Sequence, residues 1–303
     1  MTFTTQIKDE VTKIPQNFIE NISELAAIVR YDATIDKDKI VITLENASVA
    51  RRMYVSFKEI FGLSPKIIIR KQKRFKVDTL YILEIKEKIN SIIDKLYLKE
   101  DFSNLLETRE EKIAFLRGCF LACGSISDPK KGGYHFELTF RSSKEAKYML
   151  NILKSLEFDA KSIVRSNKYM VYLKSSEEIS DILKLLKATN SLFYFEDIRI
   201  YRDHKNMVNR LNNCEIANQE KTISTGLKQL EQINYLKDND LLDLLDEKAR
   251  IVAEYRLKYP EVSFTELSNI ITMETDYKIG RSGINHNFIK IKNLVERHKN
   301  QNN

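Results

Sequence analysis

The sequence predicts an α+β fold in which one αββαββα unit occurs twice and is followed by an all-helical C-terminal third. Elements of the same kind follow one another in the same order in residues 1–98 and 99–200, which indicates an internal duplication. Beyond residue 200, apolar residues recur at helical spacing. With only 8 Gly and 4 Pro among 303 residues, the chain has few of the residues that favour long loops. We therefore expect two repeats (1–98 and 99–200), a helical linker (201–236) and a helical domain (237–303).

The first helix of each repeat is predicted from apolar residues that share one helical face. They are Phe18, Ile22, Leu25 and Val29 in the first repeat, and Ile113, Leu116 and Phe120 in the second. A strand is expected to follow each helix, at residues 33–35 and 124–126. Small residues on both helices predict that the two pack closely at a central seam. They are Ala26 and Ala27 in the first helix and Gly118 in the second.

The remaining elements of the repeats also correspond. Alternating strands are expected at residues 39–45 and 134–140, each followed by an amphipathic helix. The matching apolar positions are Ala50, Met53, Phe57 and Ile60 in one helix, and Ala146, Met149, Leu153 and Leu156 in the other. A second pair of strands follows in each repeat, at 66–70 with 77–83 and at 161–165 with 169–173. The closing helices are expected at 85–96 and 179–186.

Three helices are predicted in the C-terminal domain. The first covers residues 241–258 and is ended by Pro260. Ser263 and Glu266 have the spacing of a capping box, which predicts the start of the second helix. Ser282 is expected to cap the third helix. Its apolar positions are Ile284, Phe288, Ile291 and Val295, which leave His286, Lys290, Asn293 and Arg297 facing outward.

Composition excludes several classes of protein. Fifty Lys and Arg against 43 Asp and Glu give a net charge of +7, a weak preference for polyanionic partners. The three cysteines, Cys119, Cys123 and Cys214, are too few for a disulfide framework or a zinc site, and we interpret them as small core residues in a reducing compartment. No signal peptide and no apolar run long enough to cross a membrane is present. We expect a cytoplasmic protein with no membrane partner.

Basic residues gather in two places. Residues 278–303 contain six Lys or Arg and one Glu, whereas residues 237–303 contain 11 of each sign. Such a concentration suits a helix that enters the phosphate-lined major groove, although a solvated helix end is the simpler alternative. The second cluster, residues 66–76, has six basic and no acidic residues at a strand-turn-strand junction. It is either a soluble hairpin or a secondary DNA-binding edge, and its candidate residues are Arg70, Lys71, Lys73 and Arg74.

Several segments resemble a known family. Residues 25–33 and 116–124 resemble, loosely, the paired motif helices of LAGLIDADG homing endonucleases. A closer resemblance, to the WhiA family, is carried by residues 115–126 (FLRGCFLACGSI) and continues through 208–218 (VNRLNNCEIAN), 255–260 (YRLKYP) and 281–286 (RSGINH). It covers nearly the whole chain. This resemblance implies a LAGLIDADG-like scaffold without nuclease chemistry, followed by a helix-turn-helix domain of the sigma-factor type.

The motif helices also indicate whether the scaffold can cleave DNA. In LAGLIDADG nucleases an acid near the end of each motif helix holds divalent metal. The first repeat has Asp32 at this position, with Ala33 in place of the usual glycine, and the second has Cys123, whose neutral thiol cannot replace a carboxylate for magnesium. We therefore expect no catalytic residue, no metal, no cofactor and no enzyme. An endonuclease that retains metal at Asp32 is one alternative to this interpretation.

The resemblance places DNA contacts in the helix-turn-helix domain. Asn285 and His286 can donate and accept hydrogen bonds at base edges, whereas Arg281 suits phosphates, as do Lys290 and Lys292. Asn287 and Ile289 stand where the family tends to have basic residues. The candidate DNA-binding residues are Ser263, Arg281, Ser282, Asn285, His286, Lys290, Lys292 and Arg297.

The predicted function is sequence-specific binding of double-stranded DNA, favoured as a monomer, by a nucleoid-associated transcriptional regulator. The resemblance implies roles in cell division and chromosome segregation, and in sporulation in lineages that sporulate. Other transcription or division proteins are further candidate partners. A second alternative is an adaptor of the division apparatus, in which the helix-turn-helix docks on protein.

Overall fold

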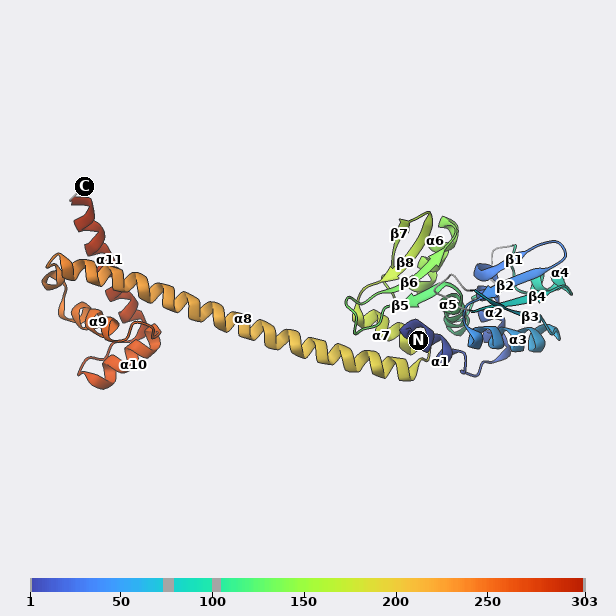
Figure 1. The fold of residues 1–303 in the computed structure, drawn as a ribbon, viewed down its shortest axis with the longest axis horizontal. Coiled ribbons are helices and arrows are strands. Elements are labelled where there is room, and N and C mark those ends of the chain that lie inside the picture. The colour runs from blue at the N-terminus through green and yellow to red at the C-terminus, as the bar shows by residue number, and fades with distance from the viewer. Residues whose placement is uncertain (1, 73–78, 100–104, 302–303) are drawn as a thin grey trace. The chain divides into compact units, whose positions relative to one another are not determined.

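The computed structural model describes residues 2–72, 79–99 and 105–301 (Figure 1). The chain divides into two compact units, Met1–Asp203 and His204–Asn303, and each is described by itself. Within the described residues, no helix is both long and apolar enough to cross a membrane.

Helices α2 (Phe18–Asp32) and α5 (Arg109–Cys123) form the centre of the first unit and lie between its two sheets (Figure 1). A Cβ atom added at Gly118 would lie 2.4 Å from the Glu24 carbonyl oxygen and 2.7 Å from the Cβ of Ala27. The two backbones are therefore so close that only glycine fits at this position. The predicted seam between small residues is confirmed.

The two sheets have the same antiparallel topology. The first, in the order β1-β2-β4-β3, contains β1 (Ala33–Ile35), β2 (Ile40–Leu44), β4 (Thr79–Ile85) and β3 (Lys66–Lys71). The second, in the order β5-β6-β8-β7, contains β5 (Gly124–Ile126), β6 (Phe136–Phe140), β8 (Lys168–Leu173) and β7 (Lys161–Arg165). Equivalent residues also pair in the same register, since Ile68 lies opposite Ile82 and Ile163 opposite Met170. The duplication is therefore confirmed, and it extends to the register in which the strands pair.

Two amphipathic helices, α3 (Ala47–Phe61) and α6 (Ser143–Ser155), follow β2 and β6. All eight of their predicted apolar positions are buried. The closing helices are α4 (Ile89–Lys95) and α7 (Ser176–Leu185). Helix α4 starts later than residue 85 because strand β4 continues to Ile85. Phe18, the first residue of α2, is 52% exposed, and the Lys95 ammonium lies 5.2 Å from the centroid of its ring.

Helix α1 (Phe3–Val11) precedes the repeat and was not predicted. The Thr4 hydroxyl donates to the Ile126 carbonyl of the second repeat, and the Asp9 carboxylate accepts from the Asn46 amide of the first. The Glu10 carboxylate accepts from the backbone N–H groups of Asn190 and Ser191, at the start of helix α8 (Thr189–Asp238). Helix α1 therefore ties the two repeats and the start of α8 together.

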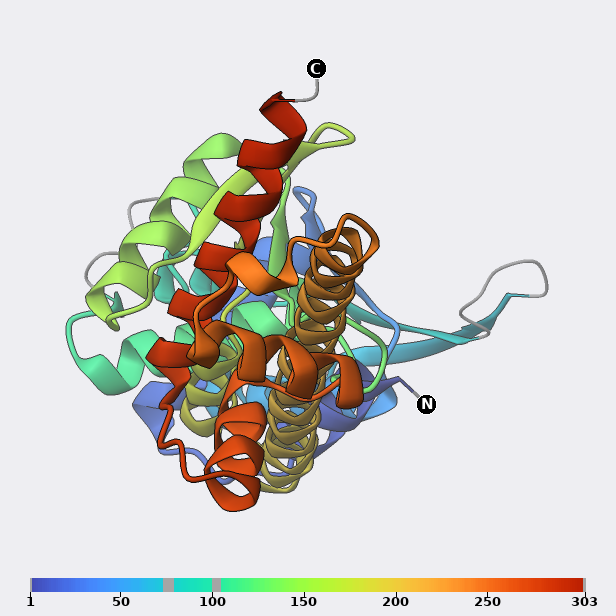
Figure 2. The ribbon, with the colours of Figure 1, turned by 90° about the vertical axis from the view of Figure 1, so that its left-hand side faces the viewer.

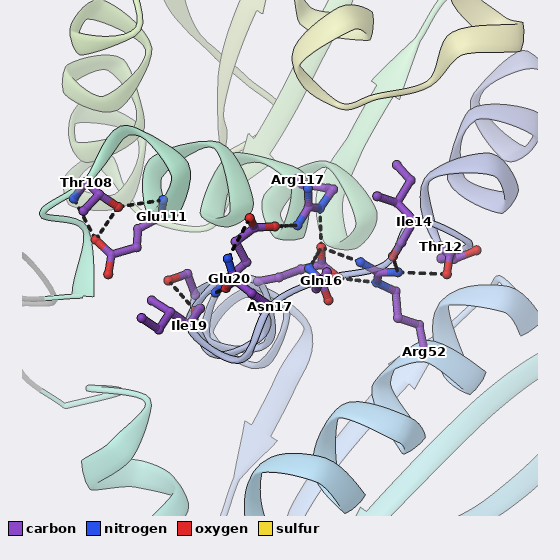
Figure 3. Close-up of polar contacts among 12 residues, drawn as sticks. Thr12, Ile14, Gln16, Asn17, Ile19, Glu20, Arg52, Thr108, Glu111 and Arg117 are labelled. Carbon is purple, nitrogen blue, oxygen red and sulfur yellow. Dashed lines mark hydrogen bonds and ion pairs between the residues drawn. The ribbon is translucent and has the colours of Figure 1, made fainter.

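A buried ion cluster fixes the seam (Figure 3). The Glu24 carboxylate of α2 accepts from Arg52 Nε and from Arg117 Nε, each at 2.5 Å, and from the Gln16 amide. Glu24 is 2% exposed and Arg117 is 1% exposed. Arg52 also donates to the Thr12 carbonyl. Since a buried charge is tolerated only when it is paired, this network holds α2, α3 and α5 in one arrangement.

The second unit contains α8 from His204 onward, a short 3₁₀ helix (Leu242–Leu244), and helices α9 (Glu247–Lys258), α10 (Phe264–Glu274) and α11 (Arg281–Gln301) (Figure 2). Helix α9 starts later than the predicted residue 241 because the Asp246 carboxylate caps it by accepting from the Ala249 N–H. Helix α8 includes the whole range 201–236. Cys214 on α8 is exposed, so its interpretation as a core residue was wrong, whereas Cys119 is buried.

Candidate nucleic-acid interface

Helix α11 has one buried and one exposed face. Its four predicted apolar residues are buried against α9 and α10. The exposed face carries Arg281, Ser282, Asn285, His286, Ile289, Lys292, Asn293 and Arg297. Six of the eight predicted DNA-binding residues therefore share one solvent-facing surface, which we call the α11 face.

The α11 face combines polar groups with one large apolar side chain. Asn285 and His286 are adjacent in the first half of the helix, and Ile289 is 47% exposed one turn farther on. Lys292 forms an ion pair of 3.7 Å with Glu296, and both side chains are more than half exposed. Such surface pairs contribute little free energy, so Lys292 can exchange its partner for another anion at small cost.

Lys290 lies at the border of this face and is half-buried. Its ammonium donates to the Asp246 carboxylate at 2.5 Å and so joins α11 to the start of α9. The hydrogen bond from Lys290 holds the pKa of Asp246 below its usual value. Lys290 therefore has a structural partner that the sequence did not reveal, and a phosphate would compete with Asp246 for it.

One prediction for α11 was wrong, and a second residue, Asn287, has an unexpected place. Ser282 does not cap the helix, because the helix begins one residue earlier at Arg281 and the Ile284 N–H donates to the Gly280 carbonyl. Asn287 does not face solvent. It is buried, and its amide donates to the Gly283 carbonyl at 2.9 Å. The departure from the family at residue 287 therefore changes the interior of the domain, not its exposed face.

Helix α10 begins with the predicted capping box, which is confirmed. The Ser263 hydroxyl accepts from the Glu266 N–H at 3.2 Å, and the Glu266 carboxylate accepts from the Ser263 N–H at 2.7 Å. The Ser263 N–H and the Ser263 hydroxyl, which both donate to this carboxylate, lower the pKa of Glu266. At the other end of the connection to α11, the Ser268 hydroxyl donates to the Ile279 carbonyl and fixes the segment between the two helices.

A buried arginine, Arg256, holds the turn between α9 and α10. It is 1% exposed, and its Nη1 donates to the carbonyls of Tyr259, Pro260 and Val262. Its guanidinium lies 5.8 Å and 5.5 Å from the ring centroids of Phe264 and Phe288, respectively. One buried cation therefore organises the turn between α9 and α10 and packs against both α10 and α11.

The described part of the second basic cluster includes strand β3. Arg70 and Lys71 are exposed at the edge of the first sheet. Lys73 and Arg74 lie outside the described residues. The α11 face and strand β3 belong to different units of the chain.

Asp32 and Cys123, which end the helices α2 and α5, have a lysine in their surroundings. Lys8 of α1 interacts electrostatically with both Asp32 and Cys123 and lies 5.8 Å from the ring centroid of Phe120. Burial raises the pKa of Asp32 to about 6 and that of the Cys123 thiol to about 12. Among the residues that the structure describes, no group of three or more His, Cys, Asp or Glu side chains could hold a metal ion.

Together these features define a class of protein: a duplicated, degenerate LAGLIDADG-like scaffold followed by a helix-turn-helix domain. The chain belongs to the WhiA family. Residues 19–99 match the model of the WhiA N-terminal LAGLIDADG-like domain, 112–205 that of the WhiA LAGLIDADG-like domain and 208–295 that of the WhiA C-terminal helix-turn-helix domain.

Relatives of nearly equal length support this assignment. A probable cell division protein WhiA of Bacillus cytotoxicus is 35% identical, and the match covers 98% of this chain and 97% of the relative. Another from Thermoanaerobacter sp. is 36% identical, with 99% and 98% covered. The crystal structure of full-length WhiA from Thermatoga maritima is similar with a TM-score of 0.59 and 26% identity, over 98% of this chain and 99% of that one.

Proposed function

We propose that the protein is a sequence-specific DNA-binding regulator that inserts α11 into the major groove of double-stranded DNA. The observation that carries this proposal is the α11 face, where six predicted DNA-binding residues are exposed together on a helix whose other face is buried. The major groove admits one α-helix, and its base edges can be distinguished by side chains that both donate and accept hydrogen bonds. Asn285 and His286 have this chemistry.

The proposed roles differ among the residues. Asn285 and His286 contact base edges. Ile289 lies against the floor of the major groove. Arg281 and Lys292 contact phosphates at the groove walls. Arg297 and Ser282 add further backbone contacts. Ser263 presents the start of α10 to a phosphate, and Lys290 binds a phosphate in competition with Asp246. The scaffold adds a secondary contact to DNA through Arg70, Lys71, Lys73 and Arg74.

In the cell, we propose that this activity regulates genes of cell division and chromosome segregation, and of sporulation where it occurs. The support is family membership and relatives that are named probable cell division proteins. The proposal makes the protein a cytoplasmic monomer on the nucleoid, with duplex DNA as its main partner and other transcription or division proteins as further partners. We also propose that the chain has four parts: two repeats (1–98 and 99–200), a helical linker (201–236) and a helix-turn-helix domain (237–303).

We propose that the protein is not an enzyme. Cleavage on this scaffold needs a carboxylate from each repeat, and Cys123 supplies a thiol with a raised pKa instead of the second carboxylate. The first acid, Asp32, has the Lys8 ammonium as a neighbour, which weakens its attraction for a dication.

The test of the DNA-binding proposal is a binding titration over a range of salt concentrations, together with genome-wide co-precipitation of bound DNA. Affinity should fall steeply as salt rises, because each phosphate contact releases condensed counterions. Co-precipitation should recover discrete sites that share a sequence motif. Salt-independent binding, or recovery of DNA without any preferred sites, would contradict the proposal and favour the adaptor alternative.

A further inference from the structure

The second unit contains a pocket of about 450 Å³ that the sequence did not reveal. It lies between the C-terminal half of α8 and the starts of α10 and α11. Its lining includes Lys221, Thr222 and Thr225 of α8, together with Ser263, Arg256 and Arg281.

A glycine brings α8 to this position. A Cβ atom added at Gly226 would lie 2.4 Å from the Pro260 carbonyl oxygen, so the turn after α9 touches the backbone of α8. The same turn leads directly into the capping box at Ser263. The close approach therefore sets Lys221, one turn before Gly226, beside the start of α10.

The pocket is rich in positive charge and in donors. Lys221 and Arg281 are exposed, and the described residues of the lining include no Asp or Glu. Arg256 is buried at the pocket, and its Nε has no hydrogen-bond partner among the described residues. A buried donor without a partner is rare and favours a ligand that accepts hydrogen bonds.

The hydroxyl groups of Thr222, Thr225 and Ser263 already donate hydrogen bonds within the protein. Those of Thr222 and Thr225 already donate to carbonyls of α8, at 2.9 Å and 2.7 Å. The Ser263 hydroxyl accepts from the Glu266 N–H and itself donates to the Glu266 carboxylate. The charged donors that remain are Lys221 and Arg281, which can converge on one anion with the positive end of the α10 dipole behind them.

We propose that this pocket binds a phosphate group of the DNA backbone and that Lys221 makes α8 part of the nucleic-acid interface. The inference rests on the proposed DNA binding. The chemistry required is that of a phosphate oxygen, which a free phosphate shares. Duplex DNA is favoured because Arg281 belongs both to the pocket and to the α11 face, so a phosphate held here would be adjacent to DNA on α11.

The test compares Lys221→Gln with Lys228→Gln in the full chain. Lys228 is also exposed, lies two turns farther along the same face of α8 and does not line the pocket. Binding to a mixed-sequence duplex of about 30 base pairs is measured against salt. Loss of one phosphate contact should make the logarithmic salt slope shallower by about 1 and lower affinity about eightfold at ~0.1 M salt. Lys228→Gln should change neither, and Lys221→Arg should retain most of the affinity.

The outcomes separate the two proposals. Absence of duplex binding by the unaltered protein would overturn the proposed function and this inference with it. Binding that Lys221→Gln and Lys228→Gln alter equally would overturn this inference alone. A third arm adds inorganic phosphate at constant ionic strength and follows the thermal midpoint. A rise that is lost in Lys221→Gln, with unchanged DNA affinity, would assign the pocket to free phosphate and overturn its role in DNA binding.

Discussion

The seam between α2 and α5 and the outer face of α11 both carry charged groups on helices, but they use them differently. At the seam, Glu24 pairs with Arg52 and Arg117 inside the protein. On α11, Arg281 and Lys292 are exposed, and Lys292 has only a weak surface pair. The central charges of the scaffold therefore hold its own helices together, whereas the charges of α11 stay accessible to a ligand.

The largest expected effect is at the seam. Glu24→Ala should lower the free energy of unfolding by about 3–5 kcal/mol, because it leaves two buried guanidinium groups without their carboxylate. Urea unfolding followed by circular dichroism measures the change. Glu296→Ala removes the surface pair on α11 instead and should cost less than about 1 kcal/mol. If both variants lost a similar free energy of unfolding, the charges of the seam and those of the α11 face would not differ in their contribution to stability.

The next effect concerns DNA sequence preference. Asn285→Ala and His286→Ala should each reduce discrimination between a selected site and random DNA by about 1–3 kcal/mol, since each removes hydrogen bonds to a base edge. Competition binding with both DNAs measures it. Asn293→Ala, also exposed on α11 but nearer the C-terminus, is the matched control. If random and selected DNA lose affinity equally in the first two variants, these residues do not distinguish bases.

Loss of a phosphate contact on α11 should act on all DNA sequences alike. Arg281→Gln should make the logarithmic salt slope shallower by about 1 without changing the ratio of specific to random affinity. Lys290→Ala should also weaken binding to all sequences, but it frees Asp246 and therefore lowers stability as well. Thermal unfolding of both variants separates the loss of a phosphate contact from the loss of stability. A changed specificity ratio for Arg281→Gln would assign that residue to base contacts.

A smaller effect is a pH dependence that arises at the seam. The pKa of Asp32 is about 6 in the folded protein against an ordinary 3.8, so the folded state binds this proton more tightly than the unfolded state. Stability from this group therefore falls as pH rises from about 4 to about 6. Asp32→Asn should remove that fall, a gain on the order of 1 kcal/mol at neutral pH. Urea unfolding at several pH values tests it, and an unchanged pH profile in Asp32→Asn contradicts the raised pKa.

No effect at all is expected for DNA cleavage. Supercoiled plasmid incubated with Mg²⁺ or Mn²⁺ should be neither relaxed nor linearised, because one carboxylate forms only half of a two-sided metal site. The assay includes Asp32→Asn in parallel. Metal-dependent nicking that disappears in this variant would show that the seam retains nuclease chemistry.

Much of the fold was predictable because the duplication supplied an internal check on each element. An apolar pattern at Ala50 and Met53 that recurs at Ala146 and Met149 is stronger support for a helix than either pattern alone. Element ends were less predictable. Strand β4 continues to Ile85 because its partner β2 extends to Ile40, a pairing between distant residues that local spacing does not contain.

The candidate site was predicted in part, from a local pattern. The exposed face of α11 followed from helical periodicity around Ile284 and Phe288. The partner of Lys290 could not be predicted, because Asp246 is distant in sequence and meets it only through the packing of α9 on α11. The pocket at Lys221 likewise depends on the approach of Gly226 to Pro260. Only Gly226 itself, an isolated glycine in a helical segment, was a local signal of close packing.

The exposed Ile289 side chain has a consequence for the chemistry of the DNA that α11 can distinguish. An aliphatic group cannot exchange hydrogen bonds with a base edge, but it can bury the 5-methyl group of thymine. A binding site contacted by Ile289 would therefore be sensitive to replacement of a single thymine by uracil, which removes that methyl group and leaves Watson–Crick pairing intact. In the same way, methylation of a cytosine at that step would present the protein with a surface similar to that of thymine.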